Sequence, residues 1–183
     1  LTPNPHTSGG AMWNLLALWG SANPGAEEDL MARVLGNVVV MDKGARESLV
    51  AFERGLGDAA ITYEQEVHVA RLAGRRYDYV VPPITMVVEV PAAVVDRNVD
   101  AQGTRPAAEA FVAFLGSSAG QAALAEYGYR PRDEAPAAPR DPRFPPAPRV
   151  FRIDRFGGWA KAVPTFFGDE GKIMRILAET QSR

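Results

Sequence analysis

The sequence predicts an α/β fold in which mainly parallel sheets are flanked by helices. In the first third of the chain, segments with helical periodicity alternate with short apolar runs of the kind that forms buried strands. Strands that alternate with helices in this way pair in parallel, because each helix crosses over and returns the chain to the same end of the sheet. The character of the sequence changes after residue 76, where longer β-rich stretches begin.

The chain is predicted to begin with two helices and a strand. Residues 10–19 carry apolar side chains on nearly every face, so this helix should be buried. A second helix starts at Asn23-Pro24 and runs to about Leu35, because proline suits a first helical turn and the acidic residues that follow favour its positive end. The wholly apolar run at 38–41 is typical of a buried strand.

The next helix begins at Gly44, runs to about Arg54 and is closed by Gly55. Residues 59–62 are predicted to form another short strand, followed by a helix over about 64–72.

The second part of the chain is predicted to hold β-rich stretches and then two helices. The β-rich stretches are 77–81 and 85–95, and their prolines suit sheet edges. Helices are expected at 104–115 and 117–127. The first of these helices has one apolar face, made of Ala107, Ala108, Phe111, Val112 and Leu115.

Proline dominates the region that follows. Residues 131–148 contain seven prolines in eighteen residues, so we expect no regular structure there but an extended segment over the surface. A short strand at 150–153 and a C-terminal helical region complete the chain.

Composition excludes several classes of function. The 183 residues are 46% hydrophobic and 23% charged, with a formal net charge of −2, as in a soluble globular protein with no general attraction for nucleic acid. The chain has no cysteine and only two histidines, which excludes disulfides and thiolate sites and disfavours zinc or non-haem iron. No apolar run is long enough to cross a bilayer. We therefore predict neither a cofactor nor a metal.

Two segments place small residues at a predicted helix start, namely "TSGGAM" at 7–12 and "DKGARES" at 42–48. The first N–H groups of a helix have no internal partners, and the helix dipole makes that end positive. Glycine lets a ligand approach the backbone, so such an end binds oxyanions without a cationic side chain. Ser8 adds a hydroxyl donor.

Each segment taken alone also has a simpler interpretation. Ser-Gly-Gly is common in tight turns, and Gly-Ala-Arg is an ordinary helix start. The glycines fit neither a Walker A loop nor a dinucleotide-binding motif. No set of nucleophile, base and orienting residue can be assembled, since Ser8 has only His6 nearby, so an enzyme is disfavoured.

A series of motifs resembles one family over nearly the whole chain. The chain is similar to the bacterial periplasmic sulfate- and thiosulfate-binding proteins of ABC importers. The motifs, in the family's order, are "NPHTSGGAMWNLLALWG", "VVVMDKGAR", "FERGLGDAAITYEQE", "AVVDRNVDAQGTRPAAEAFVAFLGSSAGQ", "YRPRD" and "FRIDRFGGWAKA". The resemblance implies a two-lobe periplasmic-binding-protein fold of type II, with the anion enclosed between the lobes and held by uncharged donors.

The resemblance also implies a set of ligand-binding residues. The family's donors from one lobe correspond here to Ser8, Gly9, Gly10, Ala45 and Tyr63. Where the family has tryptophan this chain has Tyr63, whose phenol can accept a hydrogen bond as well as donate one.

The family's N-terminal segment is absent from this sequence, so the resemblance implies an incomplete fragment of the fold. Residues 1–68 would form part of the second lobe with the anion site, 69–130 a returning portion of the first lobe, and 131–183 a proline-rich segment and helical tail. The expected partners are sulfate or thiosulfate, an ABC permease and the missing N-terminal part of the same protein, with no nucleic acid.

The expected function is therefore substrate binding for an ABC transporter, in the periplasm or exported and membrane-associated. Two alternatives remain at this point. One is an anion-sensing effector domain of a transcriptional regulator, and the other is an enzyme acting on a phosphate or sulfate ester.

Overall fold

A computed structural model describes residues 1–132 and 141–181. The chain divides into two compact units. Unit 1 comprises Leu1–Tyr63, Val81–Val88 and Ala147–Arg183, and unit 2 comprises Glu64–Val80 and Glu89–Pro146. The division into lobes at residues 68 and 130 stays a prediction.

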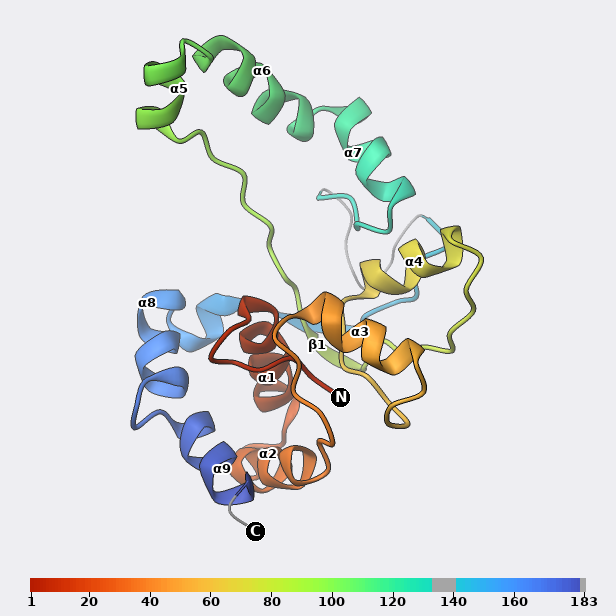
Figure 1. Cartoon of the computed structure of the whole chain (residues 1–183), viewed down its shortest axis with the longest axis vertical. Coiled ribbons are helices and arrows are strands. Elements are labelled where there is room, and N and C mark those ends of the chain that lie inside the picture. The colour runs from red at the N-terminus through yellow and green to blue at the C-terminus, as the bar shows by residue number, and fades with distance from the viewer. Residues whose placement is uncertain (133–140, 182–183) are drawn as a thin grey trace. The chain divides into compact units, whose positions relative to one another are not determined.

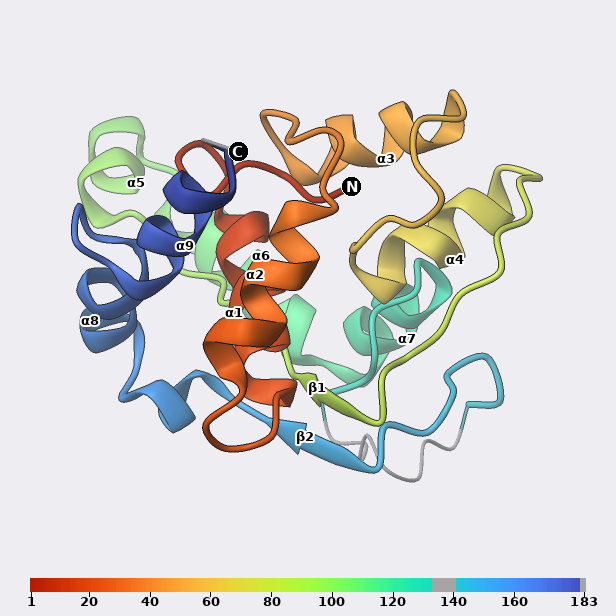
Figure 2. The ribbon, with the colours of Figure 1, turned by 90° about the horizontal axis from the view of Figure 1, so that it is seen from below.

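Unit 1 is built on helices that pack around one apolar core. Its first three helices are α1 (Gly9–Ser21), α2 (Glu27–Gly36) and α3 (Ala45–Glu53). Figure 2 shows α1 and α2 side by side, and α2 also packs against α9 (Lys172–Gln181; Figure 1). The core cluster consists of Leu15, Leu16, Met31, Leu35, Met86, Ile153, Ala162, Phe166, Ile173, Ile176 and Leu177. The apolar α1 segment is therefore buried in part, as its composition predicts.

The described strands form a small parallel sheet in unit 1. β1 (Ile84–Met86) pairs with β2 (Arg149–Phe151), and Thr85 stands opposite Val150. Helix α1 packs closely on this sheet, because a Cβ placed on Gly20 would lie 2.3 Å from Cζ of Phe151. The parallel direction confirms the predicted α/β class.

Most of the other predicted strands were wrong. Residues 38–41 and 59–62 have no regular structure, because the backbone bonds around them are isolated and do not form a ladder. Asn4 N–H donates to Asp42 O at 2.8 Å, and Ile61 N–H donates to Leu1 O at 3.0 Å. Residues 77–81 are not a strand, and of the predicted stretch 85–95 only the first two residues lie in one, β1. Several apolar side chains of these segments are exposed.

The C-terminal part of unit 1 is a series of short helical segments. They are a 3₁₀ turn η1 (Ile153–Phe156), α8 (Trp159–Ala162) and a π-helical turn η2 (Val163–Phe167) ahead of α9. Pro164 has no N–H to donate, which accounts for the departure from α-helical bonding there. Trp159 meets Trp13 edge-on, with ring centroids 4.7 Å apart. The tryptophans are core anchors.

Unit 2 contains four described helices. They are α4 (Glu64–Leu72), α5 (Asp96–Gln102), α6 (Arg105–Gly116) and α7 (Ser118–Glu126). Sequence periodicity did not predict α5, because seven residues give too few turns for a recognisable apolar face. α6 and α7 pack closely, since a Cβ on Gly120 would lie 2.1 Å from the carbonyl oxygen of Phe114.

The proline-rich region lies only partly within the described residues. Residues 133–140 of the predicted surface segment are outside them. The prediction is wrong for Phe144, which is only 2% exposed. Its ring packs edge-on against His68, 5.1 Å away, and beneath the Arg130 guanidinium. An aromatic side chain among prolines can still anchor a segment, because its apolar area outweighs the lack of regular backbone bonding.

His68 predicts a pH dependence of stability. It is buried between Phe144 and Tyr79, and its Nε2 has no hydrogen-bond partner within the described part of the chain. Burial lowers the pKa of His68 below 6.5. The nearby carboxylates of Glu64 and Asp141 oppose this shift only in part, and the positive charges of Arg71 and Arg143 add to it. Above pH 6.5 the imidazole is neutral in both the folded and the unfolded chain, so protonation of His68 does not reduce the free energy of unfolding there.

As the pH falls below 6.5, the unfolded chain takes up a proton that buried His68 resists. The free energy of unfolding should therefore decrease down to the folded-state pKa, with a slope from this group of at most about 1.4 kcal/mol per pH unit. Urea unfolding of the chain between pH 8 and pH 5 measures it. The variant His68→Phe should lose this part of the slope, and an unchanged slope would show that His68 is not responsible.

Candidate functional site

The starts of α1 and α3 are held beside each other by the segment that precedes α1. Thr7 Oγ1 donates to the carbonyl oxygen of Lys43 at 2.7 Å, and Asn4 N–H donates to Asp42 O at 2.8 Å. Both acceptors lie immediately before the N-cap of α3, which is Gly44. Two backbone-directed bonds thus fix the spacing between the two helix starts, which belong to the same unit.

The first amides of both helices are available as donors. Ser8 is the N-cap of α1, and its hydroxyl accepts the Ala11 N–H at 3.3 Å, which leaves its own hydrogen to donate outward. The N–H groups of Gly9, Gly10 and Ala45 take no acceptor among the described residues. Neutral donors therefore face outward at the first turn of each helix.

Four of the five predicted site residues converge on one point. A Cβ placed on Gly10 would lie 2.9 Å from Tyr63 Oη and 3.2 Å from the Cβ of Ala45. It would lie 3.3 Å from Ser8 Oγ. A side chain at position 10 would collide with these groups, so glycine is what lets the two helix starts, the Ser8 hydroxyl and the Tyr63 phenol lie this close together. Gly9, the fifth residue, is exposed, and a Cβ there would meet no atom within 4 Å.

Tyr63 is positioned by a buried amide that sequence reasoning missed. Asn14, on the buried face of α1, donates from Nδ2 to the carbonyl oxygen of Ile61 at 3.0 Å. The segment before Tyr63 is thereby tied to α1 itself. The signal was present in the sequence, because Asn14 is the one amide in an otherwise apolar helical segment and must find a buried partner.

The charges near the site differ between the two helix starts. α1 has no acidic residue in its first turn, whereas α3 has Glu47, whose carboxylate lies beside Gly44. The start of α1 therefore keeps its positive dipole end without an internal counter-anion. Within residues 1–132 and 141–181, no group of three or more histidine or acidic side chains could hold a metal ion. The donor set matches a small oxyanion.

A family model described as bacterial extracellular solute-binding protein matches residues 1–130. The chain belongs to this family. Other solute-binding proteins match almost the whole chain. The sulfate-binding protein of Synechococcus elongatus is 41% identical and covers 97% of this chain. The thiosulfate-binding protein of Escherichia coli is 37% identical over 96% of it.

A solved structure of the same family has the same fold. The sulfate-binding protein SubI from Mycobacterium tuberculosis H37Rv superposes with a TM-score of 0.77 at 35% identity, over 91% of this chain. The match covers 58% of the SubI chain and 53% of the Synechococcus elongatus protein. The chain thus spans about half the length of the relatives it matches. Among residues 1–132 and 141–181, no helix has the length and apolarity needed to span a membrane.

Proposed function

We propose that the chain supplies the anion-binding helices of the solute-binding component of an ABC importer, and that the anion is sulfate or thiosulfate. The observation that carries this proposal is the close approach of Ser8, Ala45 and Tyr63 around Gly10, where the starts of α1 and α3 meet. The family and the binding named for its relatives support the same class of ligand.

Each of the five residues has a part in the proposed site. The N–H groups of Gly9, Gly10 and Ala45 donate to anion oxygens, and the hydroxyls of Ser8 and Tyr63 add side-chain donors. A dianion loses much hydration energy on burial, so several well-aimed donors must replace its water together. No cationic side chain is required, because the amides are aligned with two helix dipoles.

The proposal includes two protein partners and a location. A permease would receive the anion, and the part of the solute-binding fold that this chain does not span would complete the enclosure of the ligand. The protein would act outside the cytoplasmic membrane, where its relatives' family works. The relatives named above bind solutes, so binding rather than catalysis is proposed. No observation favours the transcriptional-regulator or ester-hydrolysing alternatives.

Calorimetry with sulfate tests the function. The sample is a chimera in which this chain replaces the matching segment of the Synechococcus elongatus sulfate-binding protein. We expect the chimera to bind sulfate with a dissociation constant in the micromolar range or below. The isolated chain should bind at least about 100-fold more weakly, a loss of about 2.7 kcal/mol, because part of the enclosure is absent.

A chimera that folds but binds neither sulfate nor thiosulfate would refute the proposed function. Equal affinity of the chimera and the isolated chain would show instead that these five residues form a complete site on their own.

A further inference from the structure

The apolar surface of helix α6 is only partly covered by the other described residues of the chain. Ala108, Val112 and Leu115 form one half-buried stripe. A second stripe, spaced by three and four residues, is exposed and consists of Ala107, Ala110, Phe111 and Phe114. The two stripes together span about 200° of the helix, whereas a surface helix usually has an apolar face of about 100°.

The exposed stripe carries large aromatic rings. Phe111 is 61% exposed and Phe114 is 47% exposed, and no residue of α6 is fully buried. The sequence placed Phe111 on one apolar face with Ala108, Val112 and Leu115, and in the structure Phe111 is exposed while those three are half-buried. An isolated exposed phenylalanine is unremarkable, but two on one stripe with alanines between them form a packing surface.

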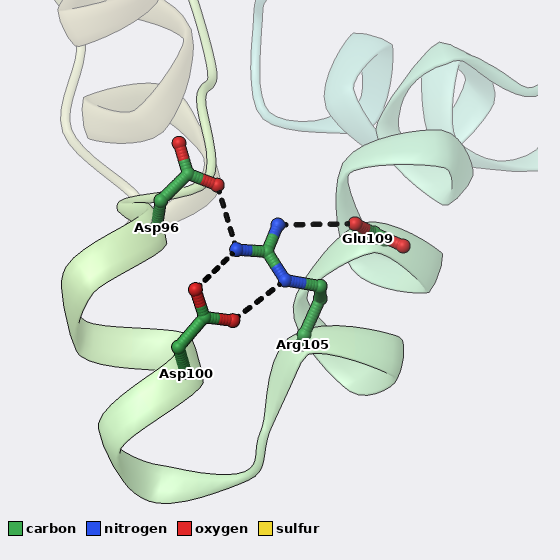
Figure 3. Close-up of polar contacts among 4 residues, drawn as sticks. All are labelled: Asp96, Asp100, Arg105 and Glu109. Atoms are coloured by element: carbon green, nitrogen blue, oxygen red, sulfur yellow. Dashed lines mark hydrogen bonds and ion pairs between the residues drawn. The ribbon is translucent and has the colours of Figure 1, made fainter.

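An ion cluster holds the polar side of α6. Arg105 bonds both carboxylate oxygens of Asp100, at 2.8 and 2.9 Å, and also contacts Asp96 and Glu109 (Figure 3). These hydrogen bonds to carboxylates raise the pKa of Arg105. The cluster joins α5 to the first turn of α6 and occupies a different side from the exposed stripe. Helix α6 is therefore oriented within unit 2, with the aromatic stripe left open.

In the described part of unit 2, no sheet covers this stripe. The core cluster found in the described residues lies entirely in unit 1. Unit 2 has helices and irregular segments but no strand in its described part, and Val80, Val90 and Val95 of those segments are exposed. A helix in an α/β unit buries its apolar face against a sheet. The described part of unit 2 has the helices of such a unit but not the sheet, since β1 and β2 both belong to unit 1.

We infer that the stripe Ala107, Ala110, Phe111 and Phe114 is the docking surface for the part of the solute-binding fold that this chain does not span. Relatives of matching sequence are nearly twice as long, so such a part exists in the family. Two phenylalanines among alanines provide the ridges and gaps that a strand layer fills. This inference rests on one part of the proposed function, namely that the remainder of the solute-binding fold is a partner of this chain. It does not depend on which anion is bound.

The chimera defined above tests the docking surface through the variant Phe111→Asp. In the isolated chain, Phe111 is 61% exposed, so the substitution should change Tm by no more than about 2 °C. In the chimera, the same change should lower Tm by at least about 5 °C, because a charge would be buried at the new contact. Leu72→Asp on α4 is the matched control, since Leu72 is 65% exposed and lies off the stripe. It should have a small effect in both proteins.

Other outcomes overturn the inference. They are an equal fall of Tm in both proteins, no fall in the chimera, or a chimera that does not fold. Sedimentation of the isolated chain examines a second copy as the occupant, and a dimer that Phe111→Asp dissociates would contradict the docking role. A chimera whose Tm falls as expected on Phe111→Asp but which binds no sulfate would contradict sulfate as the ligand and still support the docking surface.

Discussion

Replacing Gly9 by aspartate is expected to abolish sulfate binding by the chimera while leaving the fold intact. A side chain at Gly9 meets no atom within 4 Å, so the new carboxylate can be accommodated without moving a neighbour. It would stand at the first turn of α1, where it competes with the anion for the same amides. Two unit charges about 4 Å apart repel by roughly 4 kcal/mol near a protein surface, so the loss of affinity should exceed about 100-fold.

The same substitution should raise Tm slightly, because a negative charge stabilises the start of a helix and α1 has no acidic residue there. Affinity and stability would thus move in opposite directions, which separates loss of the site from loss of the fold. Calorimetry and thermal unfolding of one sample measure both.

Two control variants accompany Gly9→Asp. Gly9→Asn has the same shape without the charge and should weaken binding far less. Gly36→Asp introduces the same charge at the end of α2, where a Cβ also meets no atom within 4 Å, and should leave affinity unchanged. If Gly9→Asp bound sulfate as tightly as the unmodified chimera, the start of α1 would not be part of the site.

The variant Arg130→Met is expected to lower the free energy of unfolding by about 2 to 3 kcal/mol. Arg130 donates to both oxygens of Glu64, at 2.7 and 2.9 Å, and to the carbonyl oxygen of Pro145 at 2.6 Å. The two side chains are only 22% and 19% exposed. Removing one partner of a buried ion pair costs about 3 to 5 kcal/mol, and the remaining exposure reduces this figure.

A double-mutant cycle tests whether the loss comes from the stranded carboxylate. The double variant Glu64→Gln, Arg130→Met should recover a large part of the stability, because no unpaired charge is left. Arg33→Met is the matched control, since its ion pair with Asp29 has both side chains about 70% exposed. Its loss should stay below about 0.5 kcal/mol. Similar losses for Arg33→Met and Arg130→Met, measured by urea unfolding, would contradict the buried-pair explanation.

The helices were the part of the fold that the sequence predicted best. The expected helix at 64–72 matches α4, and most other helices differ by a few residues at their ends. Helical periodicity is a local property, so it survives even where long-range neighbours differ. The short strands at 38–41 and 59–62 failed for the opposite reason. An apolar run becomes a strand only when a partner completes its ladder, and no local pattern reveals that partner.

The candidate site divides in the same way. The helix starts at 8–10 and 45 could be proposed from small residues and caps, since these act on the adjacent backbone. The contact by which Asn14 positions the segment before Tyr63 could not, because its partner Ile61 lies more than thirty residues away along the chain. Phe111 shows the limit of amphipathic patterns, which identify an apolar face but not whether this chain covers it.

Helix α1 has the candidate site at one end and the sheet at the other. Its thirteen residues extend over roughly 20 Å, from the glycines at its start to Gly20 beneath Phe151. A helix of this length moves as a rigid body, so binding at its first turn and movement of the strand at its other end would be coupled. A displacement of the strand would move every amide of the first turn by the same amount. Binding of an anion at those amides would in turn displace the strand, without a rotamer change in any side chain.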